Sequence, residues 1–143
     1  MQNKLEHIFE LQDKLNAKFG WSQAELLALP ELERLQRVRN FLEVLSIETG
    51  EAIKAAKGRW WKQDKDWQGY EHLKEELVDC LHFLFSAYLA AGGNAADIYE
   101  KYITKNQFNH ERKDWAINEH HDATAHPSQP NPSPTDGGSV PRP

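Results

Sequence analysis

The sequence predicts an all-α protein, a bundle of four to five helices. Apolar residues recur at alternating spacings of three and four along four long segments, which places them on one face of a helix. No segment shows the sustained alternation of apolar and polar residues that would build a sheet. Glycines stand where the helical patterns stop, at Gly20, Gly58 and Gly92, as expected of residues that end helices.

The first predicted helix covers about residues 3–19 and carries an amide in the middle of its apolar stripe. That stripe consists of Leu5, Ile8, Gln12, Leu15 and Phe19. Asn16 lies one turn beyond Gln12. Because a buried amide needs hydrogen-bond partners, Gln12 indicates a polar contact inside the bundle.

The second helix is predicted over residues 30–57, after a short turn of helix that begins at Ser22. Ser22 and Glu25 have the spacing of a capping box. Pro30 is expected in the first turn of the long helix, where its missing N–H is not needed. The apolar residues of this helix form a broad face, which consists of Leu35, Val38, Phe41, Leu42, Val44 and Leu45.

The third helix is predicted over residues 71–91 and becomes apolar nearly all round after Leu77. We therefore expect it to be the most enclosed element, and its apolar surplus predicts a homodimer in which two copies share a core. Asn94 can cap the fourth helix. The stripe of that helix changes from apolar to cationic and amide along its length, through Ile98, Tyr102, Lys105, Asn109 and Arg112.

The composition changes at about residue 119. Six of the seven prolines lie in residues 127–143, among small and polar residues. Such a segment cannot bury enough apolar surface to offset the entropy of ordering it, so we expect a disordered tail over residues 119–143 and a single domain over residues 1–118. His120, His121 and His126 lie in this tail, where a rigid metal geometry is not expected.

Charge and composition exclude several classes of protein. The net charge of −5 argues against a general nucleic-acid surface. No stretch approaches the roughly 20 apolar residues of a membrane span, and the amino-terminal residues are charged. Cys80 is the only cysteine, so the chain has no internal disulfide. We expect a soluble, cytoplasmic protein with neither a membrane nor a nucleic-acid partner.

Four acidic residues continue the apolar stripes of the second and third helices. Glu48 and Glu51 extend one stripe, while Glu76 and Asp79 share a face one helical turn apart. Burying an unpaired carboxylate costs several kcal/mol, and these two helices offer no equal set of inward lysines. The pattern therefore predicts a bound divalent cation. Carboxylate oxygens suit Mg²⁺, or Mn²⁺, and magnesium sites of this kind are completed by substrate phosphates.

The pattern is also compatible with other classes of protein. Either acidic pair alone is typical of a solvated helix face or of ion pairing with Lys54 or Lys74. A carboxylate-bridged di-iron bundle is an alternative, although its usual pairs are Glu-x-x-His. A helical binding or regulatory domain without catalytic activity is another.

Several motifs together resemble the all-α dimeric dUTPase family. The resemblance covers residues 5–112 and extends to the wider group of all-α nucleoside triphosphate pyrophosphohydrolases, which includes MazG-type and dCTP-cleaving enzymes. The motifs are Glu48-x-x-Glu51, Trp60-Trp61-Lys62, Glu76-x-x-Asp79, His82-Phe83 and Lys105-Asn-x-x-Asn109-x-x-Arg112. Their joint occurrence is far more specific than either acidic pair.

The resemblance implies magnesium-dependent hydrolysis of dUTP, and of dUDP, to dUMP with release of pyrophosphate or phosphate, which limits uracil incorporation into DNA. A related enzyme acting on dCTP or on a modified nucleotide is the alternative. The acids Glu48, Glu51, Glu76 and Asp79 would hold the metal, and Glu48 would also accept the proton of the attacking water. Carried onto matching positions, the resemblance assigns base recognition to Gln12, Asn16, Trp61 and His82, a deoxyribose contact to Phe83, and phosphate binding to Lys62, Lys105, Asn109 and Arg112.

Overall fold

The computed structural model describes residues 3–57 and 67–112, and every regular element in these ranges is a helix. The all-α prediction is therefore confirmed. The five helices of the described residues are α1 (Lys4–Ala17), α2 (Gln23–Leu27), α3 (Glu31–Ala55), α4 (Tyr70–Ala90) and α5 (Ala95–Glu111). One compact unit spans Met1–His110, and a second begins at Glu111. The predicted domain boundary after residue 118 lies outside the described residues.

Side-chain caps mark where α1 and α2 begin, and Pro30 precedes α3. The Asn3 side chain accepts a hydrogen bond from the backbone N–H of Leu5 at the start of α1. Ser22 and Glu25 form the predicted capping box at the start of α2. Pro30 is the residue before α3 rather than part of its first turn, because its ψ of 147° is extended while its carbonyl already accepts from Arg34. The prediction for Pro30 was wrong by one position.

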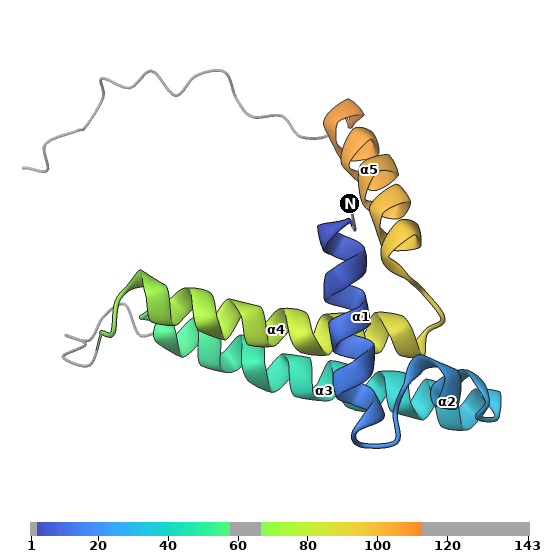
Figure 1. Ribbon diagram of the computed structural model, residues 1–143. Coiled ribbons are helices and arrows are strands. Elements are labelled where there is room, and N and C mark those ends of the chain that lie inside the picture. The colour runs from blue at the N-terminus through green and yellow to red at the C-terminus, as the bar shows by residue number, and fades with distance from the viewer. Residues whose placement is uncertain (1–2, 58–66, 113–143) are drawn as a thin grey trace, which may run out of the picture. The chain divides into compact units, whose positions relative to one another are not determined.

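Helix α4 is the central element, as the sequence predicted. It lies beside α3 along its length and is also packed by α1 and α2, and Figure 1 shows α1 crossing the α3–α4 pair. Ala87 and Ala90 of α4 pack with Leu26 and Phe41 in one buried cluster. Small side chains at these positions let the helices approach closely.

The buried face of α1 differs from the predicted stripe. Phe9, Gln12 and Asn16 are buried, whereas Ile8, Leu15 and Phe19 are exposed. The helix is turned so that Phe9 packs with Leu89 and Ala95, and its ring lies 4.8 Å from that of Phe85. Placing this large ring in the core also points the two amides inward.

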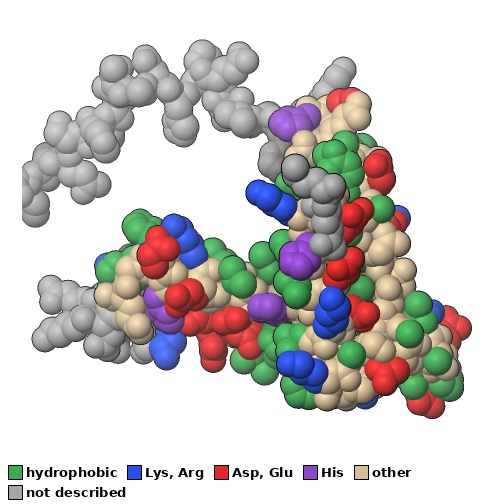
Figure 2. Space-filling model, in the orientation of Figure 1, with side chains coloured by type: hydrophobic (Ala, Val, Ile, Leu, Met, Phe, Trp, Pro, Cys, Tyr) green, Lys and Arg blue, Asp and Glu red, His purple; other side chains and the backbone are tan. Residues whose placement is uncertain are grey.

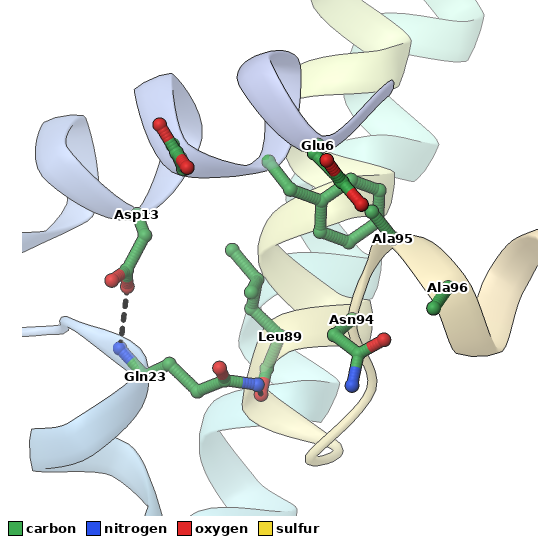
Figure 3. Close-up of a pocket in the computed structure, with 9 residues that line it drawn as sticks. Glu6, Asp13, Gln23, Leu89, Asn94, Ala95 and Ala96 are labelled. Atoms are coloured by element: carbon green, nitrogen blue, oxygen red, sulfur yellow. Dashed lines mark hydrogen bonds between the residues drawn. The ribbon is translucent and has the colours of Figure 1, made fainter. Parts of the chain in front are cut away.

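Gln23 fixes α2 against the end of α4. Its Nε2 donates to the backbone oxygens of Leu89 and Gly93 at 3.2 and 2.7 Å. Its backbone N–H donates to Oδ1 of Asp13 at 2.6 Å, the bond drawn dashed in Figure 3. These bonds tie the carboxyl-terminal half of α1 to α4, and that half carries Gln12 and Asn16.

Two glycines end α4, as predicted. Gly92 has a φ of +92°, a left-handed conformation that L side chains rarely adopt. Gly93 donates to the carbonyl of Tyr88, and a Cβ at Gly93 would lie 2.1 Å from the Tyr88 ring. The chain therefore turns sharply before α5, whose first turn docks through Ala95 and Ile98.

An apolar surface remains uncovered on α4. Leu77, Val78, Leu81 and Leu84 are between 39 and 50% exposed, so the middle of this helix is not enclosed within one chain. None of the described helices is both long enough and apolar enough to cross a membrane.

Candidate active site

Three carboxylates from two neighbouring helices meet at one place. Glu48 of α3 and Glu76 and Asp79 of α4 each offer an oxygen, and the three oxygens lie within 4.8 Å of one another. Figure 2 shows acidic side chains gathered along the α3–α4 pair. We call these three residues the carboxylate cluster. Its donors are all hard oxygens, the ligand type that Mg²⁺ and Mn²⁺ prefer.

Glu51 does not join the cluster. Its side chain is exposed, one turn along α3 from Glu48, and it is not among the three acids whose oxygens come together. The charge of Glu51 nevertheless acts on Glu48. Burial raises the pKa of Glu48, and the charges of Glu51, Asp79 and Glu76 raise it further. Like charges held together in this way are what a divalent cation relieves.

The nearby lysine does not neutralise the cluster. Lys74 lies 2.7 Å from Glu71, on the preceding turn of α4. Glu76 has His72 as its neighbour instead, with Nε2 at 3.4 Å from the carboxylate oxygen. Sequence reasoning missed His72, although its four-residue spacing before Glu76 signals the contact.

Four polar side chains form a second group where α1 crosses α4. They come as two pairs spaced four apart, Gln12 with Asn16 on α1 and His82 with Ser86 on α4. Gln12 Nε2 donates to Asn16 Oδ1 and to Ser86 Oγ, both at 3.0 Å. Gln12 Oε1 lies 2.6 Å from His82 Nδ1. We call this group the amide network.

The orientation of the Gln12 carboxamide decides which nitrogen of the His82 imidazole carries the proton. Since Gln12 turns its oxygen toward His82, Nδ1 must carry the hydrogen and donate to it. Ser86 Oγ lies 3.1 Å from Asn16 Oδ1 and 2.8 Å from the carbonyl oxygen of His82, so its hydroxyl can donate to either. Gln12 thus uses both of its N–H groups and its carbonyl within the protein.

Asn16 is the member of the network with an unused group. Its side chain is 5% exposed, and its Nδ2 has no hydrogen-bond partner among the described residues. A buried N–H without a partner costs about 1–3 kcal/mol, so a site where a ligand supplies the acceptor is a physical reason to keep it. The sequence had pointed to Asn16 but not to Ser86, which is 2% exposed. Ser86 continues the stripe of Glu76, Asp79 and Phe83, and its place on this stripe is the sequence feature that could have identified it as a site residue.

Of the remaining predicted site residues, Phe83, Lys105 and Asn109 are not gathered at the carboxylate cluster. Phe83 packs against the buried cluster around Phe41. Lys105 is exposed with Nζ 5.1 Å from the Phe108 ring, Asn109 is half-buried, and no Cα of α5 lies within 8 Å of α3. Arg112 belongs to the segment beyond His110, so its position against the acids stays a prediction. Trp61 and Lys62 lie outside the described residues.

Fold and site together define an all-α bundle with an oxygen-donor cluster on its two longest helices and a buried amide network beside it. The sequence model of the dUTPase family matches residues 4–96, which contain both groups. The chain belongs to this family.

A shorter similarity links the chain to another nucleotide enzyme. It is 43% identical over 42 residues to the dCTP pyrophosphatase of Enterobacteria phage T4. The match covers 29% of this chain and 25% of the phage protein. The fold has no significant match among solved structures.

Proposed function

We propose that the protein is a magnesium-dependent pyrophosphohydrolase that cleaves dUTP, and dUDP, to dUMP. The observation that carries the proposal is the convergence of Glu48, Glu76 and Asp79, none of which forms a salt bridge with a lysine in the part of the chain that the structure describes. Family membership supports the substrate class. The proposed setting is the cytoplasm, where the reaction would limit uracil incorporation into DNA.

The spacing of the two groups along α4 suits a nucleotide. Asp79 and His82 are three residues apart, a rise of about 4.5 Å, so the carboxylate cluster and the amide network are neighbours on one helix. A pyrimidine at the network would direct its phosphates toward the acids. Phe83 directly follows His82 on α4 and is the proposed deoxyribose contact.

The chain supplies a proton acceptor for the attack of water. Burial and the neighbouring acidic charges raise the pKa of Glu48 above the ordinary carboxyl value, which suits a proton acceptor. Glu48 takes a proton from water while the water oxygen forms a bond to phosphorus. The bond from that phosphorus to the leaving group breaks, which releases pyrophosphate from dUTP or phosphate from dUDP. Glu48, Glu76 and Asp79 would hold magnesium, which would neutralise charge on the phosphate oxygens. Glu51 would contribute as an outer carboxylate.

Cationic and aromatic residues would complete the site. Lys62, Lys105, Asn109 and Arg112 are proposed to hold the phosphates, and Trp61 to lie along the base. Asn16 offers the unused donor for the pyrimidine edge.

We also propose that the protein is a homodimer. Leu77, Val78, Leu81 and Leu84 form an exposed apolar surface on α4, and isolated surface leucines do not line up in this way without a partner. A second copy of α4 is the complementary surface that a twofold dimer provides.

A nucleotide panel tests the function. The full-length protein is incubated with each canonical nucleoside triphosphate and with dUDP, with Mg²⁺, with Mn²⁺ and with EDTA, and pyrophosphate and phosphate are measured. dUTP is included in the panel beside these nucleotides, and we expect dUTP and dUDP to be cleaved only with the metal. Absence of metal-dependent turnover on every nucleotide would reject the enzyme and favour a binding domain.

Cleavage of dCTP is the second candidate. The similarity to the phage dCTP pyrophosphatase supports it. The panel separates the two candidates by their kcat/KM values.

A further inference from the structure

The amide network has two arrangements that keep the same three hydrogen-bonded links at Gln12. In the observed one, His82 Nδ1 donates to Gln12, and Gln12 donates to Asn16 and Ser86. If both carboxamides turn by half a rotation and the imidazole proton moves to Nε2, every one of these links reverses direction. Gln12 then donates to His82 and accepts from Asn16 and from the Ser86 hydroxyl, because a hydroxyl can act in either sense.

The two arrangements differ in what Asn16 offers to a ligand. In the observed arrangement its unused group is the Nδ2 donor. In the reversed arrangement Nδ2 is consumed by Gln12, and the unused group is the Oδ1 acceptor. Gln12 transmits this choice, since it contacts both His82 and Asn16. In the observed arrangement both of its N–H groups are used within the network, whereas in the reversed one only the N–H that points to His82 is used.

The same inversion separates uracil from cytosine. Uracil carries an oxygen at position 4, which accepts, whereas cytosine carries an amino group there, which donates. We propose that Gln12 and Ser86 are positioning residues that set, together with the His82 tautomer, whether Asn16 presents a donor or an acceptor to position 4 of a pyrimidine. The site then takes dUTP in the observed arrangement and dCTP in the reversed one. This inference rests on the proposed nucleotide hydrolysis.

Burial makes the arrangement selective. Gln12, Asn16 and Ser86 are between 2 and 6% exposed, so a mismatched donor or acceptor finds no water to satisfy it. A buried site with the wrong partner discriminates strongly between ligands of nearly equal size. The reversal of the network is therefore the step that lets one site serve both bases.

Gln12→Glu tests the coupling, by which we mean that Gln12 sets which group of Asn16 faces the ligand, and it leaves Asn16 itself unchanged. A carboxylate at position 12 cannot donate, so it accepts from Asn16 Nδ2 and leaves the Asn16 oxygen facing the ligand. We expect the ratio of kcat/KM for dUTP to that for dCTP to fall by about tenfold or more. An unchanged or increased ratio overturns the coupling, as does a wild-type enzyme that cleaves dUTP and shows no turnover of dCTP.

Two further variants isolate the coupling. Gln36→Glu is the matched control, because Gln36 donates to Asn40 at 2.8 Å in the same four-residue spacing on the exposed side of α3. We expect it to leave the ratio unchanged. Asn16→Asp replaces the donor directly and is expected to lower the ratio as Gln12→Glu does. A shift with Asn16→Asp and none with Gln12→Glu would keep Asn16 as a base contact and reject the role of Gln12.

The tautomer of His82 gives a readout that needs no variant. In ¹⁵N spectra of the wild-type imidazoles, we expect the proton on Nδ1 in the free protein and with a non-hydrolysable dUTP analogue, and on Nε2 with the dCTP analogue. A proton on Nε2 in the free protein, or one tautomer with both analogues, overturns the proposal. If no nucleotide is hydrolysed, the proposed function fails, and the free-protein spectrum still tests the network.

Discussion

The phenolic hydroxyl of Tyr88 donates a hydrogen bond of 2.5 Å to Oδ2 of Asp97, joining the last turn of α4 to the first turn of α5. Burial raises the pKa of Tyr88 to about 12, assisted by the hydrogen bond and charge of Asp97. The same hydrogen bond, with smaller help from Lys101, lowers the pKa of Asp97. This bond holds the start of α5 against the bundle.

Tyr88→Phe should destabilise the protein at neutral pH. We expect the melting temperature to fall by roughly 3–6 °C, because the bond to a charged acceptor is lost. The difference in stability between the wild type and this variant should disappear in acid, as pH falls through the lowered pKa of Asp97. It should also disappear in base, as pH rises from the ordinary tyrosine pKa of 10.0 toward the raised pKa of about 12. Thermal unfolding across pH measures both limits.

Tyr99→Phe is the control for this prediction. Tyr99 lies on α5 with 55% of its surface exposed. Because Tyr99 is exposed, removal of its hydroxyl should change the melting temperature little. Equal effects of the two variants at all pH values would show that the contact to Asp97 does not hold α5.

Glu48→Gln should remove turnover while leaving the helices intact. The amide cannot accept the proton of water, so we expect kcat for dUTP to fall by about 100-fold or more. Asp79→Asn should have a similar effect through loss of a metal ligand. Glu75→Gln is the matched control, because Glu75 neighbours the cluster in sequence with its side chain 80% exposed. Near-normal rates in both site variants, with unchanged circular dichroism, would reject the metal cluster.

Metal binding should be visible in stability even without substrate. In EDTA, Asp79→Asn should raise the melting temperature by about 1–3 °C, because it relieves repulsion from Glu48 and Glu76. With Mg²⁺ at a hundredfold excess over Kd, the wild type should gain about 2.7 kcal/mol and the variant far less. A variant that gains as much from Mg²⁺ as the wild type would place the metal elsewhere.

The affinity for Mg²⁺ should weaken as pH falls through the raised pKa of Glu48. This carboxyl keeps its proton to a higher pH than the ordinary value of 4.5, and the metal must displace that proton. Without metal, the raised pKa stabilises the fold below pH 4.5, and this contribution is lost as pH rises through the folded value. Calorimetry in two buffers with different ionisation enthalpies should detect proton release in this window, and Glu48→Gln should abolish it.

The helical fold was predictable because local signals agreed with it. Ser22 and Glu25 formed their capping box, and Gly92 ended α4 where the pattern stopped. The carboxylates were predictable because Glu48, Glu76 and Asp79 interrupt apolar faces. Glu51 was not separable from them by spacing, since it continues the same three-four stripe as Glu48, and only its exposed side chain in the structure sets it apart.

The orientation of α1 depended on a contact that spacing alone does not encode. Ile8 and Phe9 are both apolar, and either could have marked the buried face. Packing of Phe9 against Phe85 and Leu89 decides it, and these residues are far away in sequence. Ser86 was missed for the same reason, because its role depends on the crossing of two helices rather than on its neighbours in the chain.

The dimer prediction can be tested on α4 itself. Leu81 is 43% exposed in the middle of the apolar surface, so Leu81→Arg places a charge where a second copy of the helix should pack. Because burying an unpaired charge costs several kcal/mol, we expect this variant to be monomeric by light scattering after gel filtration. Leu32→Arg is the control, since Leu32 is 79% exposed in the first turn of α3 and lies away from this stretch of α4 in sequence and element. A wild type that is already monomeric, or a Leu81→Arg variant that stays dimeric, would remove α4 from the interface.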